Sequence, residues 1–288
     1  MNNYVIYTDS ACDLDPNMLR QRDVYYSSLS FYFYGDNKLY FDNQISSTEF
    51  YQRMRNGEKA KTSAINSESF VGDFRRILEQ GYDILYIGFS SALSSTYNSA
   101  RLASEQLKGE YPQRKILTVD TLSASAGIAL LLDMVIERKD SGATIEEARD
   151  YANTIKKNIC HYFTVDNLEY LKRGGRISPS SAFFGNMLGI KPLLYVNNEG
   201  RLVSISKIRG RKMSIMALAD KFDELNDDAV NKIAYISHAD CEEEAKELKK
   251  HIEEKYNARV PVITNIGSVI GAHSGPGTMA LFFVGKKR

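Results

Sequence analysis

Hydroxyl and carboxylate side chains collect where apolar runs of the chain give way to turns. Four pairs stand at such places: Asp9/Ser10, Thr62/Ser63, Ser94/Ser95 and Asp120/Ser123. A Ser or Thr that precedes a helix can cap it, and its hydroxyl can also donate a hydrogen bond to a ligand oxygen. Because a helix N-terminus also presents unpaired N–H groups and a partial positive charge, these turns are suited to a small anion such as a carboxylate.

The turn after residues 84–89 is the richest of the four in hydroxyl groups. Residues 84–89 form a short apolar run that is typical of a buried strand, and residues 97–107 show the apolar spacing of a helix. The hydroxyl side chains between them are Ser90, Ser91, Ser94, Ser95 and Thr96. The stretch lacks the glycine and lysine pattern of a nucleotide-binding loop. We therefore expect it to bind a small anion; the alternative is that the serines only cap the helix.

A second candidate stretch, residues 266–277, holds four glycines, one proline and His273. So much glycine lets the backbone approach a ligand closely or adopt a positive φ. We therefore predict a loop in which His273 donates a hydrogen bond to an oxyanion. The alternative is a histidine that is hydrogen-bonded within a purely structural loop.

The same residues could instead perform catalysis. Ser94 or Ser95 could act as a nucleophile with His273 as its base, and Asp9 or Asp120 would then orient the imidazole. The sequence has no Gly-x-Ser-x-Gly elbow, so a serine esterase or thioesterase is the alternative and not the first hypothesis. A third hypothesis, from the hydroxyl-rich turns alone, is a subunit that binds a sugar or a small acid. No His-Glu-x-x-His motif or Cys/His cluster occurs, so no metal or other cofactor is predicted.

Composition narrows the class of protein. The chain has 288 residues, a formal net charge of +1 and three widely spaced cysteines. The near-zero charge gives no electrostatic drive toward nucleic acids or acidic membranes, and an odd number of separated cysteines favours a reducing compartment. The sequence shows no basic segment followed by an apolar core at its start, and no apolar run of about 20 residues. We therefore predict a cytoplasmic protein with at most transient membrane contact.

The order of the elements in residues 1–158 predicts how the polar turns meet. Strands are predicted at 4–7, 84–87 and 116–119, and helices at 67–80, 128–139 and 145–157. This alternation is typical of an α/β domain with a parallel sheet, whose strands end at one shared edge where ligands bind. All four polar turns are expected to lie at that edge.

Residues 159–288 have a different pattern. Strands are predicted at 160–165, 191–196, 201–208, 232–238, 260–265 and 281–285, and helices at 178–188, 212–226 and 241–256. The tight turn at residues 197–200 predicts a hairpin between two of these strands. We therefore expect a C-terminal α+β domain, with a ligand between the two domains and the last strands packed against the site of the first.

Seven blocks of the sequence, in one order, are similar to those of a known family. They are YTDSACDL (7–14), KTSAIN (61–66), SSALSSTYNSA (90–100), VDTLSASAG (119–127), LEYLKRGGRIS (168–178), Lys191-Pro192-Leu193 and GAHSGPG (271–277). On these blocks the whole chain resembles the DegV family, the bacterial fatty-acid-binding proteins that serve as the acyl-carrying subunit of fatty acid kinase. The resemblance implies two α/β domains with one long-chain fatty acid held between them.

The resemblance also implies roles for single residues. Thr62 and Ser94 match residues that bind the carboxylate, and His273 matches the loop histidine near it. The supporting candidates in the polar turns are Ser63, Ser95, Asp9 and Ser123. A separate kinase subunit would phosphorylate the bound acid, so this chain is expected to be a non-catalytic carrier. Two departures from the family pattern, Ser95 in place of glycine and Ile65-Asn66 in place of Pro-Ser, leave the exact set of hydrogen bonds open.

A fatty acid also needs a long apolar slot. Burying about fifteen methylenes at roughly 0.8 kcal/mol each gives about 12 kcal/mol gross, so the tail sets affinity and the hydroxyls set direction. The predicted slot residues are Phe183, Phe184, Met187, Leu188, Ile266 and Ile270. Arg173 and Arg176 flank the glycine pair at residues 174–175, and two roles are open for them. They either contact the kinase or a membrane surface, or they complement the C-terminus of a helix that the glycines cap.

Overall fold

A four-stranded parallel sheet forms the core of the first half of the protein, in the order β2-β1-β6-β7. The computed structural model describes residues 3–177, 189–227 and 232–288. The strands of this sheet are β1 (Tyr4–Asp9), β2 (Val24–Ser27), β6 (Asp83–Gly88) and β7 (Ile116–Asp120). Every residue of β1 is buried, as expected for a central strand that is covered on both faces.

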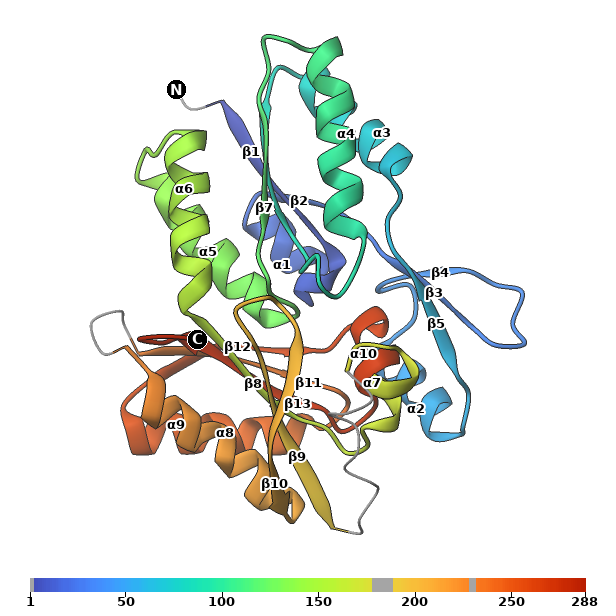
Figure 1. Cartoon of the computed structure of the whole chain (residues 1–288), viewed down its shortest axis with the longest axis vertical. Coiled ribbons are helices and arrows are strands. Elements are labelled where there is room, and N and C mark those ends of the chain that lie inside the picture. The colour runs from blue at the N-terminus through green and yellow to red at the C-terminus, as the bar shows by residue number, and fades with distance from the viewer. Residues whose placement is uncertain (1–2, 178–188, 228–231) are drawn as a thin grey trace.

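Helices cover both faces of the parallel sheet. They are α1 (Pro16–Gln21), α3 (Ser67–Glu79), α4 (Thr96–Glu110), α5 (Ala126–Asp140) and α6 (Ile145–Ile155), with short 3₁₀ turns at Ser10–Cys12 and Lys156–Asn158. Figure 1 shows α3 and α4 on one side of the sheet and α5 and α6 on the other. Local signals fix these helices: Asn66 caps α3, and a capping box of Thr144 and Glu147 begins α6.

A small antiparallel sheet, β4-β3-β5, stands beside the parallel one. It consists of β3 (Ser30–Phe33), β4 (Tyr40–Phe41) and β5 (Ala60–Ser63), with α2 (Ser47–Arg55) connecting the last two. Phe31, Phe33 and Phe50 contact one another and belong to the core that this sheet shares with the parallel sheet. Thr62 and Ser63 therefore end a strand of this sheet, and the prediction that they lie at the edge of the parallel sheet is wrong.

The second half of the protein is built on a six-stranded mixed sheet in the order β10-β9-β8-β13-β11-β12. The strands are β8 (Ile159–Thr164), β9 (Ile190–Val196), β10 (Leu202–Arg209), β11 (Ile233–His238), β12 (Arg259–Asn265) and β13 (Met279–Val284). The helices are α7 (Glu169–Arg173), α8 (Arg211–Leu225), α9 (Glu242–Tyr256) and α10 (Ser268–Ser274). The hairpin predicted through residues 197–200 is confirmed as the antiparallel pair β9–β10.

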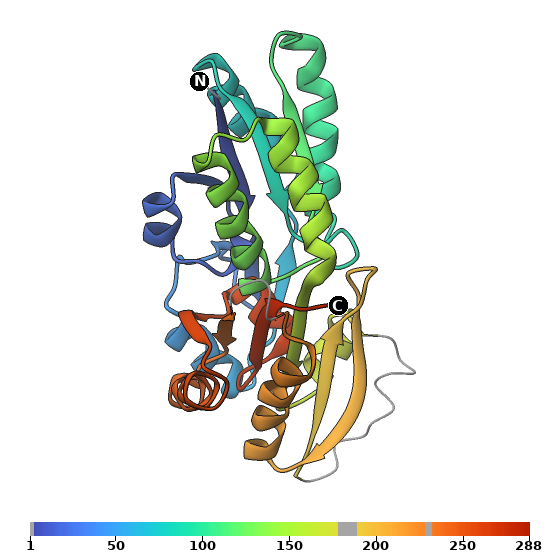
Figure 2. The ribbon, with the colours of Figure 1, turned by 90° about the vertical axis from the view of Figure 1, so that its left-hand side faces the viewer.

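The two faces of the mixed sheet have different neighbours. Along β13, Leu281 and Phe283 belong to the core formed with α8 and α9, whereas Ala280 and Phe282 belong to the core shared with the first half. This follows from the strand period of two, which places alternate side chains on opposite faces. Figure 2 shows the parallel sheet and the mixed sheet one above the other, with α8 and α9 on the outer side.

The predicted fold class, a parallel-sheet α/β unit followed by an α+β unit with a hairpin, is confirmed. All strands of the four-stranded parallel sheet end by residue 120, and all strands of the mixed sheet begin at residue 159 or later. The boundary at 158/159 stays a prediction. Among the residues that the structure describes, no helix is both long and apolar enough to cross a bilayer. The helix predicted at 178–188 lies outside the described residues.

Candidate ligand-binding site

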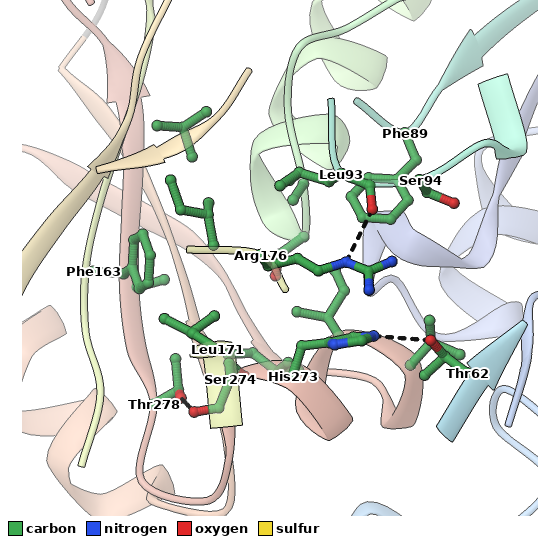
Figure 3. Close-up of a pocket in the computed structure, with 18 of the residues that line it drawn as sticks. Thr62, Phe89, Leu93, Ser94, Phe163, Leu171, Arg176, His273, Ser274 and Thr278 are labelled. Carbon is green, nitrogen blue, oxygen red and sulfur yellow. Dashed lines mark hydrogen bonds between the residues drawn. The ribbon is translucent and has the colours of Figure 1, made fainter. Parts of the chain in front are cut away.

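An elongated set of side chains from both halves encloses a cavity of about 250 Å³. Its apolar walls come from the turn after β6, from β8, β13 and α7, and from the β9–β10 hairpin. They include Phe89, Leu93, Phe163, Leu171, Val196, Leu202 and Phe282. Figure 3 shows Phe163 on one side of this space and a group of polar side chains on the other.

The polar group collects most of the residues that the sequence singled out. Cavity-lining residues of this kind are Thr62, Ser63, Ser94, Ser95, Arg176 and His273. The Thr62 Oγ1 atom lies 2.8 Å from Nε2 of His273. Residues from β5, from the turn after β6, from the end of α7 and from α10 therefore meet at one end of the cavity, although they are up to 211 positions apart in sequence.

The Ser94 turn is held by a buried carboxylate behind it. Asp9 accepts hydrogen bonds from the Phe89 N–H at 2.9 Å, from the Ala11 N–H at 3.1 Å and from the Tyr86 hydroxyl at 2.6 Å. The carboxylate is fully buried, and Asp9 is not among the described residues that line the cavity. Its place is therefore behind the turn that presents Ser94 to the cavity.

Ser123 has a similar supporting position. Its carbonyl accepts from the Ser90 N–H at 2.9 Å, and its hydroxyl lies 2.8 Å from Nε2 of His161. His161 lines the cavity but Ser123 does not. Burial, with a smaller effect of Arg288, holds the pKa of His161 well below its ordinary value, so this imidazole is neutral. The sequence alone favours a structural role for His161, because it lies within a predicted strand, at residues 160–165.

His273 lies in a helix, so the prediction of a glycine-rich loop is wrong for this part of the stretch. The last glycines, Gly275 and Gly277, have positive φ and end the segment, whereas Gly267 and Gly271 serve close packing within it. Burial, with smaller effects of the nearby Arg176 and Arg173, lowers the pKa of His273 to about 4. The imidazole is therefore neutral near pH 7.

The glycine pair after α7 has a role beyond ending a helix. A Cβ atom on Gly174 would lie 2.1 Å from Nδ1 of His273, so only glycine lets the imidazole approach this backbone. Gly175 adopts the left-handed conformation with φ +69°, which ends the helix. Gly175 thus ends helix α7, and Gly174 forms part of the surface against which the His273 ring packs.

The sequence allows Arg173 and Arg176 the same two roles, but the two side chains have different surroundings. Arg176 lines the cavity, and its guanidinium donates to the carbonyls of Leu93 at 3.1 Å and Gly174 at 2.6 Å. Burial lowers the pKa of Arg176, and no ion pair joins it within the described part of the chain. Arg173 instead lies over the Tyr170 ring, 5.0 Å from its centre, and is not among the lining residues.

Two of the six predicted slot residues, Ile266 and Ile270, line the cavity. Phe183, Phe184, Met187 and Leu188 lie outside the described residues. The sequence missed Phe89, Leu93 and Phe282, which also form the apolar wall. Strand alternation could have identified Phe282, because it shares a face with Ala280, which also lines the cavity.

The groups for a serine-hydrolase mechanism are not arranged as a triad. The Ser94 hydroxyl is hydrogen-bonded to the Thr96 hydroxyl at 2.9 Å, and Nε2 of His273 faces Thr62. Nδ1 of His273 has no hydrogen-bond partner among the described residues, so no carboxylate orients the ring. An imidazole with a pKa of about 4 is also a weak base. The esterase alternative is therefore not favoured.

A parallel-sheet unit and a mixed-sheet unit that enclose an apolar cavity with one polar end define a two-unit α/β protein with a small-molecule site. The profile of the DegV family, described as a family of uncharacterised proteins, matches residues 3–286. The chain belongs to the DegV family, as its sequence blocks predicted.

Two relatives match in sequence, and one solved structure matches in fold. A DegV domain-containing protein of Clostridium perfringens is 43% identical and covers 99% of this chain and 98% of its own. A fatty acid-binding protein of Thermotoga maritima is 38% identical over 80% of this chain and 79% of its own length. The solved structure of a stearic acid-binding protein from Eubacterium ventriosum superposes with a TM-score of 0.88 at 30% identity, covering 98% of both chains.

Proposed function

We propose that this protein binds one long-chain fatty acid, with the acyl chain in the cavity and the carboxylate at Thr62, Ser94 and His273. The observation that carries the proposal is the gathering of Thr62, Ser94, Arg176 and His273 in one part of a cavity whose lining is otherwise mostly apolar. The further polar residues of the lining include His161, Ser125, Ser274 and Thr278. A soap-like molecule is likewise polar at one end and apolar elsewhere. The fatty acid-binding relative and the stearic acid-binding structure support the same ligand class.

The Thr62–His273 pair would orient the hydroxyl toward the acid. If Nε2–H of the neutral imidazole donates to Oγ1 of Thr62, the threonine proton is free to donate to a carboxylate oxygen. Ser94 supplies a second hydroxyl, and hydrogen bonds to a charged acceptor contribute about 1.5–3 kcal/mol each. Arg176, a cation without an ion-pair partner among the described residues, offsets the negative charge of the ligand.

The finer part of the proposal is that a separate kinase phosphorylates the bound carboxylate. Ser63, Ala64 and Ser95 line the polar end and are exposed, whereas Phe163 and Phe282 at the apolar walls are buried. The acid group would therefore lie near the surface, within reach of a second protein. The sequence has no nucleotide-binding loop of its own, which fits a carrier that relies on the kinase for ATP. A partnership with an ATP-dependent kinase would be compatible with a cytoplasmic location.

Mass spectrometry of lipid released from the native protein tests the first part. We expect about one fatty acid per chain, and a Thr62→Ala/Ser94→Ala double variant that retains far less. Ser104→Ala is the matched control, because Ser104 is a hydroxyl on α4 that bonds only its own helix. Recovery of no fatty acid from wild-type protein, or equal recovery from the double variant, would overturn the proposal.

The second part is tested by adding a fatty acid kinase subunit and ATP to the loaded protein. We expect acyl phosphate from wild-type protein and from Ser104→Ala, and none from the double variant. Labelling with a fluorophosphonate probe separates the carrier from an esterase, since only an activated serine reacts. Covalent labelling of wild type that disappears in Ser94→Ala would favour the esterase over the carrier.

A further inference from the structure

We propose that Asp13 and Asp42 are positioning residues that fix helix α10 and thereby hold His273 against Thr62 at the ligand's carboxylate. The inference rests on the proposed function for the identity of the ligand, but the arrangement it concerns is present in the protein alone. Neither aspartate is among the described residues that line the cavity.

The first turn of α10 is capped by side chains from distant parts of the chain. Gly267 stands at the N-cap position and has no side chain to satisfy the first N–H groups of the helix. Asp13 accepts from the Gly267 N–H at 2.9 Å, and Asp42 accepts from the Val269 N–H at 3.3 Å and from the Ser268 N–H. The cap is therefore supplied across 254 and 227 positions of sequence.

The glycine at 267 is explained by these two carboxylates. A Cβ atom there would lie 2.9 Å from Oδ1 of Asp13 and 3.3 Å from both carboxylate oxygens of Asp42. Any side chain at this position would push the aspartates away from the N–H groups that they accept. Gly267 provides no capping side chain of its own, and its lack of a Cβ atom is what allows Asp13 and Asp42 to reach the first N–H groups of α10.

Both carboxylates are themselves held in place and are nearly removed from solvent. The Ser125 hydroxyl donates to Asp13 at 2.5 Å, and the Ser10 hydroxyl donates to Asp42 at 3.0 Å. Each aspartate is 5% exposed. Neither forms an ion pair within the described part of the chain, so hydroxyl and N–H donors and the positive end of α10 offset their charge. Burying a carboxylate with no cation beside it costs folding free energy. We infer that this cost is retained because the two carboxylates stabilise the first turn of α10.

The remainder of α10 is fixed by packing, so movement of its first turn would be passed to its last. Tyr51 is fully buried, donates to the Ile266 carbonyl at 2.8 Å and packs against Gly271. At the other end, the His273 ring lies against Gly174. Since α10 has only seven residues, a tilt at Gly267 displaces His273 Nε2 from the 2.8 Å contact with Thr62.

The test measures His273 itself as well as binding. We expect Asp42→Ala to weaken fatty-acid binding about tenfold, the size of a lost helix cap. Asp42→Asn keeps an acceptor oxygen and should recover most of the affinity. In the ligand-free protein, NMR titration should show the imidazole of His273 moving in Asp42→Ala toward an ordinary histidine pKa. A merely structural loss would not move that signal.

Asp133→Asn is the matched control. Asp133 on α5 bonds Arg22 and Tyr235 and accepts no hydrogen bond from α10, so its loss lowers stability without removing a bond of the cap. Should Asp42→Ala fail to fold, Gly267→Ala displaces the same carboxylates and takes its place. Wild-type titration of His273 and wild-type affinity in Asp42→Ala would overturn the inference. If wild-type protein binds no fatty acid, the proposed function fails, while the His273 titration still decides the positioning role.

Discussion

The two ends of the cavity are built in different ways. At the polar end, Thr62, Ser94 and His273 come from a strand end, a turn and a short helix. The Thr62 and His273 side chains bond each other, and the Ser94 hydroxyl accepts from the Thr96 N–H. Much of the apolar wall comes from neighbouring strands of the mixed sheet, where Phe163 and Ala280 are register partners. The polar end depends on individual contacts, whereas the wall depends on how a regular sheet packs.

This difference predicts two kinds of response to substitution. Removing one contact at the polar end changes how the acid is oriented, and leaves most of the core intact. Removing a side chain from the wall leaves a void in the core, so both stability and affinity fall. Each prediction below tests whether the two ends can be separated in this way.

The largest effect is expected from Phe282→Ala in the wall. Phe282 is 3% exposed and borders the cavity, so its loss should cost about 3–5 kcal/mol of unfolding free energy and weaken fatty-acid binding. Phe283→Ala is the matched control, since Phe283 points to α8 and α9 on the other face. It should lose similar stability in urea unfolding and keep the affinity of wild type. Equal losses of affinity in both variants would contradict the assignment of faces.

A pH-dependent effect is expected at Asp42, which holds the helix that carries His273. Burial raises the pKa of Asp42 from 3.8 to about 6, so between these values the folded protein binds a proton that the unfolded chain releases. The free energy of unfolding contributed by this group therefore falls as pH rises from about 4 to 6, and is constant above. The free energy of unfolding of wild type, relative to that of Asp42→Asn, should fall by up to about 3 kcal/mol between about pH 4 and pH 6.

Urea unfolding of the two proteins at several pH values measures this difference. Asp9 and Asp13 are present in both proteins, but the charge of Asp42 also raises the pKa of Asp13, so the difference reports Asp42 together with its effect on Asp13. Phe282→Ala compared with wild type should show no such slope. A difference that rises with pH would mean that Asp42 is favoured in its charged form by the fold.

Gly174→Ala should have an intermediate effect and should act through His273. The new Cβ would overlap Nδ1, so the ring or the backbone must move, at about 1–3 kcal/mol. Fatty-acid affinity should fall together with the Thr62–His273 contact, which NMR of the imidazole reports. Gly109→Ala in α4 is the control, because nothing lies within 4 Å of a Cβ there, and it should not lower stability. Unchanged affinity in Gly174→Ala would show that the contact between Gly174 and His273 does not contribute to fatty-acid binding.

The smallest effect is expected at Ser95. This side chain is exposed and caps no backbone N–H of α4. Ser95→Ala should therefore change unfolding free energy and affinity by less than about 0.5 kcal/mol. Calorimetric titration with a fatty acid checks this, with Ser94→Ala beside it as the variant that does lose affinity. A large effect of Ser95→Ala would assign it a direct contact with the ligand.

The parts of this arrangement that the sequence predicted are those carried by short motifs. Thr62, Ser94 and His273 were chosen from hydroxyl-rich and glycine-rich blocks, and all three line the cavity. Asp9 stands in a block of the same kind, but its carboxylate is used by three donors inside the turn. A motif shows that a turn is specialised, and it does not show which way each side chain faces.

The remaining features depend on contacts over long sequence separations. Nothing near Thr62 indicates that its strand pairs with β3 and not with the parallel sheet. The glycines of the stretch 266–277 suggested a loop, because their actual partners, Asp13 and Tyr51, are more than 200 positions away. Phe282 looks like any core residue until the sheet places it on the face with the cavity.

The cavity lies at the seam between the two sheets, and this has a consequence for the protein as a whole. A molecule that fills the cavity supplies apolar contacts that Leu171 and Phe282 otherwise lack, and so acts as an inner layer of the core. Occupancy then stabilises the folded chain in proportion to the logarithm of ligand concentration. Because a less stable protein unfolds more often and is degraded faster, the lifetime of this protein in a cell would increase with the concentration of its ligand.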